Sequence, residues 1–92
     1  KNKLMEAHIK NYLKATGKGA NDQFLCEMCG ESYMIQFHHM IYRSDGGGGE
    51  FENIICVCGT CHDKAHFKIK PYLHYETLKA KHMALVSLIQ EL

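Results

Sequence analysis

Two Cys-x2-Cys pairs constrain the fold of this chain more than any other feature of its sequence. Cys26 and Cys29 form the first pair, and Cys58 and Cys61 form the second. Four thiolates in two such pairs complete a closed tetrahedral zinc shell, and a shell with no open position is structural. The alternative is two unrelated surface pairs. Because a chain of 92 residues buries only a small core, we expect a single domain, residues 1–92, that relies on this zinc for stability.

The fifth cysteine bears on the cellular compartment. Cys56 lies in the apolar run IICV, and we interpret it as a small core residue. In an oxidised secreted protein a fifth cysteine would remain without a disulfide partner, so the pattern favours a reducing, intracellular (cytoplasmic) compartment. No apolar run approaches the roughly 20 residues of a membrane span, and no signal peptide is recognisable, so no membrane partner is expected. The chain begins at Lys1 without a methionine, which fits an excerpt of a larger protein or complex.

Hydrophobic periodicity predicts two flanking helices. The first is expected at about residues 2–16, before Gly17, and the second at about 72–91, after Pro71. The apolar stripe of the first helix comprises Leu4, Met5, Ile9, Tyr12 and Leu13. The apolar side of the second comprises Leu78, Leu85, Leu88, Ile89 and Leu92.

Between these helices, residues 24–69 are expected to form the core of an α+β fold. The alternation in YMIQFHHMI predicts a strand at 33–41, and IICV predicts a second strand at 54–57. The intervening YRSDGGGGEFEN contains four consecutive glycines and is expected to be a long loop. The run GTCHDKAHFKI then fits a short helix of about ten residues. The zinc would therefore hold a β-hairpin against a helix.

Four histidines in this core suggest a second metal site. His62 and His66 are four residues apart, so on a helix they share one face and could bind a single ion. Alone, such a pair more often belongs to a solvated helix face. With His38 it makes three protein ligands and leaves open positions, which is the catalytic pattern, and His39 is then free to act as a base. Neighbouring residues of a strand point to opposite faces, so His38 and His39 can serve one site only if the strand twists, bulges or ends there.

The motifs CEMC, HHMIYRSDGG, ENIICVC and CGTCHDKAH resemble, in this order, those of the HNH nucleases of the ββα-metal fold. The resemblance covers residues 26–66 and implies that His38 is a catalytic-metal ligand and His39 the general base. It implies that Asn53 orients His39 and its loop, and that His62 and His66 are ligands or phosphate contacts. The chain departs from the common pattern in having no proline shortly after the histidine pair and a cysteine in the second strand where proline or an apolar residue is frequent.

The resemblance implies a metal-dependent DNA endonuclease with a structural Zn²⁺ and one catalytic divalent ion, which could be Mg²⁺, Mn²⁺, Ni²⁺ or Zn²⁺. His39 would take a proton from water, the water would attack phosphorus in line, and the products would carry a 5′ phosphate. The alternative is a non-catalytic zinc-stabilised module that binds nucleic acid or protein. A pure scaffold needs only the four cysteines, so the additional histidines and Asn53 argue against it.

Charge is a weak guide to a nucleic-acid partner here, because the formal net charge is only +1. Arg43 is the one arginine of the chain, and its planar fork suits a phosphate or the charge of a transition state. An ordering pair with Asp45 is the alternative. Three lysines are expected to skirt backbone phosphates or, without nuclease function, to form a solvated face: Lys64, Lys68 and Lys70. Three further histidines receive no function: His8, His74 and His82.

Overall fold

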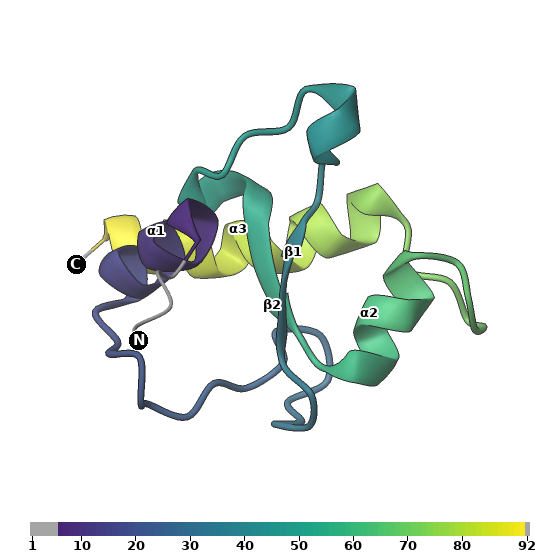
Figure 1. The fold of residues 1–92 in the computed structure, drawn as a ribbon, viewed down its shortest axis with the longest axis horizontal. Coiled ribbons are helices and arrows are strands. Elements are labelled where there is room, and N and C mark those ends of the chain that lie inside the picture. Colours follow the sequence, from purple (N-terminus) through teal and green to yellow (C-terminus); the bar gives the residue numbers. More distant parts are fainter. Residues whose placement is uncertain (1–5, 92) are drawn as a thin grey trace, which may run out of the picture.

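A computed structural model describes residues 6–91 of the chain as three α-helices and one two-stranded antiparallel sheet. The elements follow one another as α1 (Ala7–Thr16), β1 (Gln36–His39), 3₁₀ turns at Arg43–Asp45 and Phe51–Asn53, β2 (Ile54–Val57), α2 (Gly59–Ala65) and α3 (Tyr75–Gln90) (Figure 1). This arrangement confirms the predicted α+β class with flanking helices. The expected helical positions 2–5 and Leu92 lie outside the described residues.

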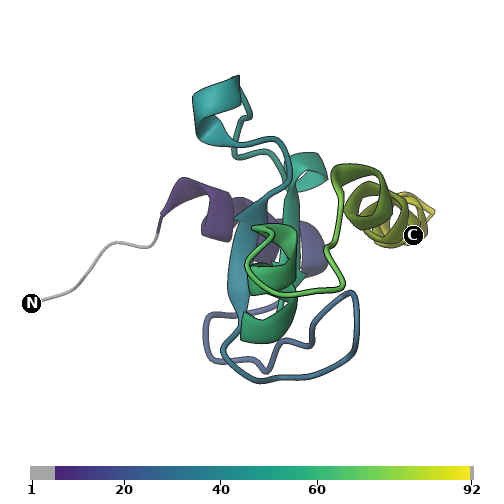
Figure 2. The ribbon, with the colours of Figure 1, turned by 90° about the vertical axis from the view of Figure 1, so that its right-hand side faces the viewer.

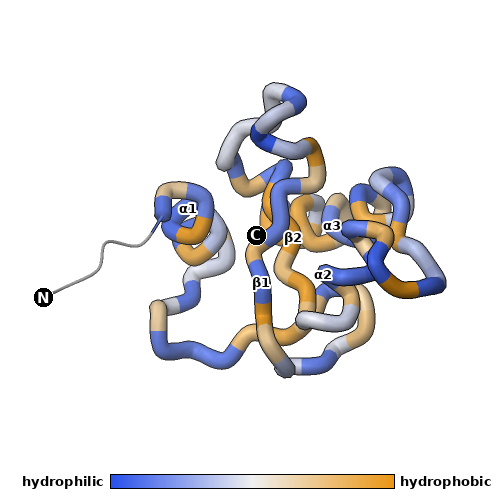
Figure 3. Tube along the Cα trace, turned by 45° about the vertical axis from the view of Figure 1, so that its right-hand side comes forward, coloured by the Kyte–Doolittle hydropathy of each residue, from blue (hydrophilic) through white to orange (hydrophobic). Residues whose placement is uncertain are grey.

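Strand β2 lies at the centre of the molecule and is covered on both faces. Ile55 and Val57 pack into a cluster with residues of α2 and α3, whereas Ile54 and Cys56 pack on the opposite face against Tyr12 of α1. In Figure 2 the hairpin lies between α1 and α3, and Figure 3 shows hydrophobic residues along β2. Burial on both sides explains why its sequence is uniformly apolar instead of alternating. The prediction of a buried Cys56 is confirmed, since it is 1% exposed.

Strand β1 is shorter than the predicted 33–41. Tyr33 and Met34 form a turn, and Met34 has a φ of 50°, outside the range that a strand allows. At the other end the Ile41 amide turns to the side chain of Asn53 instead of continuing the ladder. The strand therefore ends at His39, which is one of the conditions under which His38 and His39 could serve one site.

The helices also differ from expectation in detail. Helix α2 ends at Ala65 and does not reach residue 69, because Phe67 adopts a left-handed conformation with a φ of 60°. The buried stripe of α3 is Leu78, His82 and Val86, at a spacing of four residues. The prediction that Leu88 belongs to the apolar side of this helix is wrong, since Leu88 is 59% exposed. Among residues 6–91, none of the helices has the length and hydrophobicity to cross a bilayer.

Candidate metal centres and active site

The four paired cysteines come together in a geometry that can hold zinc. The first pair lies in a tight turn in which the Gly30 amide donates to the Cys26 carbonyl at 2.9 Å, with Gly30 at a φ of 84°. One sulfur atom from each of Cys26, Cys29, Cys58 and Cys61 lies within 4.8 Å of the others. The Cys29 and Cys58 sulfurs are 3.6 Å apart. Tetrahedral zinc with Zn–S bonds of about 2.3 Å requires sulfurs about 3.8 Å apart, so the donor set fits this ion.

Backbone amides around the Cys26 sulfur favour the thiolate form that zinc requires. Burial opposes ionisation of Cys26, but hydrogen bonds from the backbone of Cys58, Cys29 and Met28 lower its pKa to about 7. The second pair opens α2, because Cys58 is the N-cap and its sulfur accepts from the Cys61 amide at 3.5 Å. An ion held by these sulfurs would join the first pair directly to the start of α2.

A second cluster contains His38 of β1, His62 of α2 and His66, the C-cap residue of α2. One nitrogen from each imidazole lies within 4.8 Å of the other two. The Nε2 atoms of His62 and His66 are 3.1 Å apart, close to the roughly 3.3 Å that tetrahedral coordination with bonds of about 2.05 Å would give. Burial, followed by the charges of neighbouring histidines, lowers the pKa of His38 to about 4 and lowers the pKa of His62. Neutral imidazoles are the form that binds a divalent cation, so these residues fit a metal with open coordination positions.

Strand register sends the two adjacent histidines to different sides of the hairpin. His38 pairs with Ile55, on the face that α2 covers, and His39 pairs with Ile54, on the face that α1 covers. Directly opposed residues of an antiparallel pair share a face, so the histidine cluster lies on the α2 side and His39 on the α1 side. Because the strand ends at His39, both rings still border one cavity of about 300 Å³.

That cavity contains the polar groups of the candidate active site. Besides the two histidines of β1, it is lined by Tyr42, Arg43, Ser44 and His66. The Tyr42 ring stacks on His66, with centroids 5.5 Å apart and planes inclined by 17°, and meets His38 edge-on at 5.9 Å. Tyr42 thus supports two rings of the histidine cluster, a role that its position in a glycine-rich loop did not reveal.

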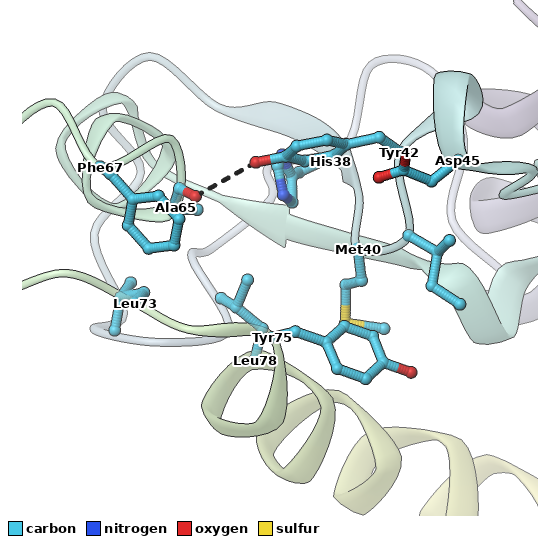
Figure 4. Close-up of a pocket in the computed structure, with 10 residues that line it drawn as sticks. His38, Met40, Tyr42, Asp45, Ala65, Phe67, Leu73, Tyr75 and Leu78 are labelled. Atoms are coloured by element: carbon cyan, nitrogen blue, oxygen red, sulfur yellow. Dashed lines mark hydrogen bonds between the residues drawn. The ribbon is translucent and has the colours of Figure 1, made fainter.

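A larger cavity of about 370 Å³ lies on the α3 side of His38 (Figure 4). Its walls are mainly apolar, with Met40, Ala65 and Leu78 among them, and the Tyr42 hydroxyl spans its edge to reach the Ala65 carbonyl at 3.5 Å. Hydrogen-bonding groups that could hold a phosphate are concentrated in the smaller cavity, which includes Arg43 and Ser44. The smaller cavity is therefore the candidate active site.

Asn53 fixes the glycine loop beside the site. Its side chain accepts from the Ile41 amide at 2.8 Å and donates to the carbonyls of Ile41 at 3.0 Å and Gly48 at 2.8 Å, and it is 5% exposed. A side chain at Gly47 would overlap the Ile41 carbonyl, so this turn requires glycine. The Asn53 carbonyl also accepts from the Met40 amide at 2.9 Å, directly after His39. Asn53 thus holds the backbone that carries His39 and does not contact its ring.

The ion pair of Arg43 differs from the predicted alternative, a pair with Asp45. Among the described residues Arg43 forms its ion pair with Glu6, at 3.3 Å, and not with Asp45. Its Nε atom also lies 3.4 Å from Nε2 of His39. Two residues that precede the zinc pairs therefore belong to this environment, Glu6 and the buried His8, whose ring centroid lies 4.6 Å from that of His39. His8 was missed because it is an isolated histidine, although its place four residues before Tyr12 put it on the buried stripe of α1.

Comparisons with known proteins agree with this geometry. Residues 26–68 match the model of the HNH endonuclease family. A curated protein, Anaredoxin from Nostoc sp. (strain PCC 7120 / SAG 25.82 / UTEX 2576), is 33% identical over 46 residues, which are 49% of this chain and 60% of that protein. No solved structure gives a significant match. The order of the motifs, the two donor clusters and the family match agree with one another: residues 26–68 are similar to an HNH endonuclease domain.

Proposed function

We propose that this chain is a metal-dependent endonuclease that hydrolyses phosphodiester bonds of DNA. The observation that carries the proposal is the common cavity of about 300 Å³, in which a histidine of a potential metal cluster and a separate histidine face the same space. One cavity can therefore contain both an ion-binding group and a proton acceptor. The match of residues 26–68 to the HNH endonuclease family supports phosphodiester hydrolysis, and DNA as the substrate is part of the proposal.

In this mechanism His39 is the general base. Partial burial, followed by the neighbouring His8 and Arg43, lowers its pKa, so the ring is unprotonated at neutral pH and can accept a proton from water. His38, His62 and His66 would hold the catalytic divalent ion. The chemistry that a bound divalent cation supplies is stabilisation of negative charge on the phosphate oxygens and on the departing 3′ oxygen.

Arg43 and Asn53 would support the base and the substrate. The Arg43 guanidinium is exposed at the rim of the cavity, where an incoming phosphate could replace Glu6 as its partner. A surface ion pair contributes only about 0–1 kcal/mol, so such an exchange costs little. Asn53 would keep His39 in place by holding the loop that follows β1, and its three side-chain hydrogen bonds support that role.

The four cysteines would bind zinc as a structural ion. A reducing, intracellular compartment suits this assignment, because zinc binds thiolates and not disulfides. All five cysteines are free in the structure, and the fifth, Cys56, lies apart from the sulfur cluster.

Nicking of supercoiled plasmid DNA tests the proposed function. The wild-type protein is expected to nick with Mn²⁺ or Mg²⁺ and to stop when EDTA is added. His39→Ala should reduce the rate about 10²- to 10⁴-fold, the usual contribution of a general base, without loss of zinc or of DNA affinity. His38→Ala should lose activity through weaker binding of the catalytic ion, and additional metal should restore part of it. No metal concentration should rescue His39→Ala.

The control is His74→Ala, because His74 is exposed and lies outside the cavity. If both His38→Ala and His39→Ala nick like the control, the nuclease assignment is wrong. Retained DNA binding in that case would favour the non-catalytic zinc module. If added metal rescues His39→Ala and not His38→Ala, the two adjacent histidines have the opposite roles.

A further inference from the structure

Helix α1 lies outside the segment that matches the family, yet it covers the proposed base. His8 is 8% exposed, and its ring contacts the ring of His39 with centroids 4.6 Å apart and planes inclined by 50°. The register of the hairpin explains the contact, because His39 is on the face that packs against α1. The ring that is proposed to accept a proton therefore has its inner side against a residue of α1.

The position of His8 is set by packing on both sides of it. Four residues later along α1, Tyr12 is 4% exposed and belongs to the core cluster on this face of β2. Asn11 donates to the carbonyl of Gly49 at 2.8 Å, which joins α1 to the glycine loop. A side chain at Gly49 would begin 3.1 Å from Cβ of His8, so glycine allows the loop to approach the helix closely at this point. His8 thus lies on a packed helix, and the neighbouring loop closes over it.

Arg43 completes this arrangement by contacting both rings. Its Nε atom lies 3.4 Å from Nε2 of His39, and one terminal nitrogen lies 3.5 Å from Nδ1 of His8 and 3.3 Å from the Glu6 carboxylate. The His8 and Glu6 contacts lie at the long end of hydrogen-bond geometry, so they orient the guanidinium only weakly. The ring of His8, held on a packed helix, is therefore the neighbour that could limit rotation of the His39 ring.

We propose that His8 is a positioning residue, whose ring holds the imidazole of His39 at the cavity, so that α1 is a working part of the nuclease site. This inference rests on the proposed function, since it assigns His8 to the reaction of that same site. Side chains that carry catalytic groups must be held within about 0.5 Å of the productive geometry by neighbours that are themselves fixed, and His8 is such a neighbour.

The test compares His8→Ala with His8→Phe in plasmid and oligonucleotide cleavage. Since misplacement by about 1 Å can cost on the order of 10²-fold, His8→Ala should lower kcat by about 10- to 100-fold, with KM nearly unchanged. His8→Phe keeps an aromatic ring of similar shape and should retain most of the activity. Asn11→Ala, which removes the hydrogen bond to Gly49 but not the ring contact, is the control for docking of α1.

A second measurement does not depend on cleavage. In the NMR spectrum, the carbon-bound ring protons of His39 should shift in His8→Ala, because the neighbouring ring current is lost, and shift less in Asn11→Ala. Unchanged zinc content and thermal melting would show that the variants are folded.

The outcomes separate the two proposals. If the wild type cuts and His8→Ala cuts equally well, or if the His39 resonances do not move, the positioning role is wrong while the nuclease assignment stands. If His8→Phe is as slow as His8→Ala, packing of the ring is not what matters, and the inference is overturned. A wild-type protein that does not cut overturns both.

Discussion

Replacement of Glu27 should destabilise the protein more than replacement of any other polar residue in the turn that carries Cys26 and Cys29, here called the zinc turn. Glu27 lies between Cys26 and Met28, but its carboxylate points inward. It accepts from the Tyr12 hydroxyl at 2.5 Å and the Cys56 amide at 2.9 Å through one oxygen, and it meets Nδ1 of His82 at 2.8 Å through the other. His82 is fully buried, and its Nε2 atom donates to the Phe51 carbonyl at 2.7 Å. One carboxylate therefore joins α1, β2 and α3 to the zinc turn.

The magnitude follows from the three buried polar groups that Glu27→Ala would leave without a partner: the Tyr12 hydroxyl, the Cys56 amide and Nδ1 of His82. Burial, with the carboxylate beside it, raises the pKa of Tyr12, so its hydroxyl keeps its proton and needs an acceptor. A buried polar group without a partner costs about 1–3 kcal/mol, so the total loss should be at least about 3 kcal/mol. For a chain of this size each kcal/mol corresponds to about 4–8 °C in Tm, and the expected decrease is about 12 °C or more.

Thermal unfolding of the zinc-loaded protein, followed by circular dichroism, measures this effect. Glu27→Gln should be much milder, about 1 kcal/mol, because its carbonyl can accept from Tyr12 and Cys56 while its amide group still faces Nδ1 of His82. Glu31→Ala, an exposed carboxylate in the same turn, should stay within about 0.5 kcal/mol of wild type. If Glu27→Ala melts within a few degrees of Glu31→Ala, the buried network does not stabilise the fold and the reasoning is refuted.

Three further outcomes are expected. Cys26→Ser should lose zinc and cooperative folding, because apparent zinc binding energies of about 10–16 kcal/mol exceed the stability of a small domain. Cys56→Ser should keep its zinc. Metal analysis and melting curves check both variants. A triple variant with alanine at Lys64, Lys68 and Lys70, in α2 and the turn after it, should bind DNA more weakly. Its binding should also depend less on salt concentration, as measured by anisotropy titrations. The midpoint of the fall in cleavage at saturating metal should lie below the pKa of about 6.5 of a free imidazole, because the pKa of His39 is lowered by burial, His8 and Arg43 against the opposing Glu6 and Glu50.

Each of these can fail in a distinct way. A Cys26→Ser protein that melts like wild type without zinc would remove the structural role of the ion. An unchanged salt slope in the triple lysine variant would mean that α2 does not face the duplex. Cleavage that already declines as the pH falls from 8 to 7 would mean that the base has a raised and not a lowered pKa.

Much of the core was predictable from the sequence because its signals are local. The two cysteine pairs indicated where chain segments separated by residues 30–57 must meet, since a metal shell requires four donors. The apolar run at Ile54–Val57 predicted β2 with its observed bounds. The spacing of His62 and His66 predicted that both lie on one side of the last turn and C-cap of α2, since four residues make about one helical turn.

The ends of elements were less predictable, because they depend on partners far along the chain. Alternating residues favoured a strand at 33–41, but Asn53 withdraws the Ile41 amide from the ladder and shortens it. Leu88 fits an apolar helix face by its sequence, yet the position of the hairpin decides that Leu78, His82 and Val86 are the buried side chains of α3.

The sequence by itself determined the two sets of potential metal donors, the hairpin that joins them and the similarity of residues 26–68 to the HNH endonuclease family. Only the tertiary structure decided which residues surround those donors: that register turns His39 toward α1, that His8 and Arg43 meet it there, and that Glu27 is buried against His82. The physical reason is that ligand spacing and hydrophobic period act over a few residues, whereas the contacts of one face with another arise only when distant segments pack together.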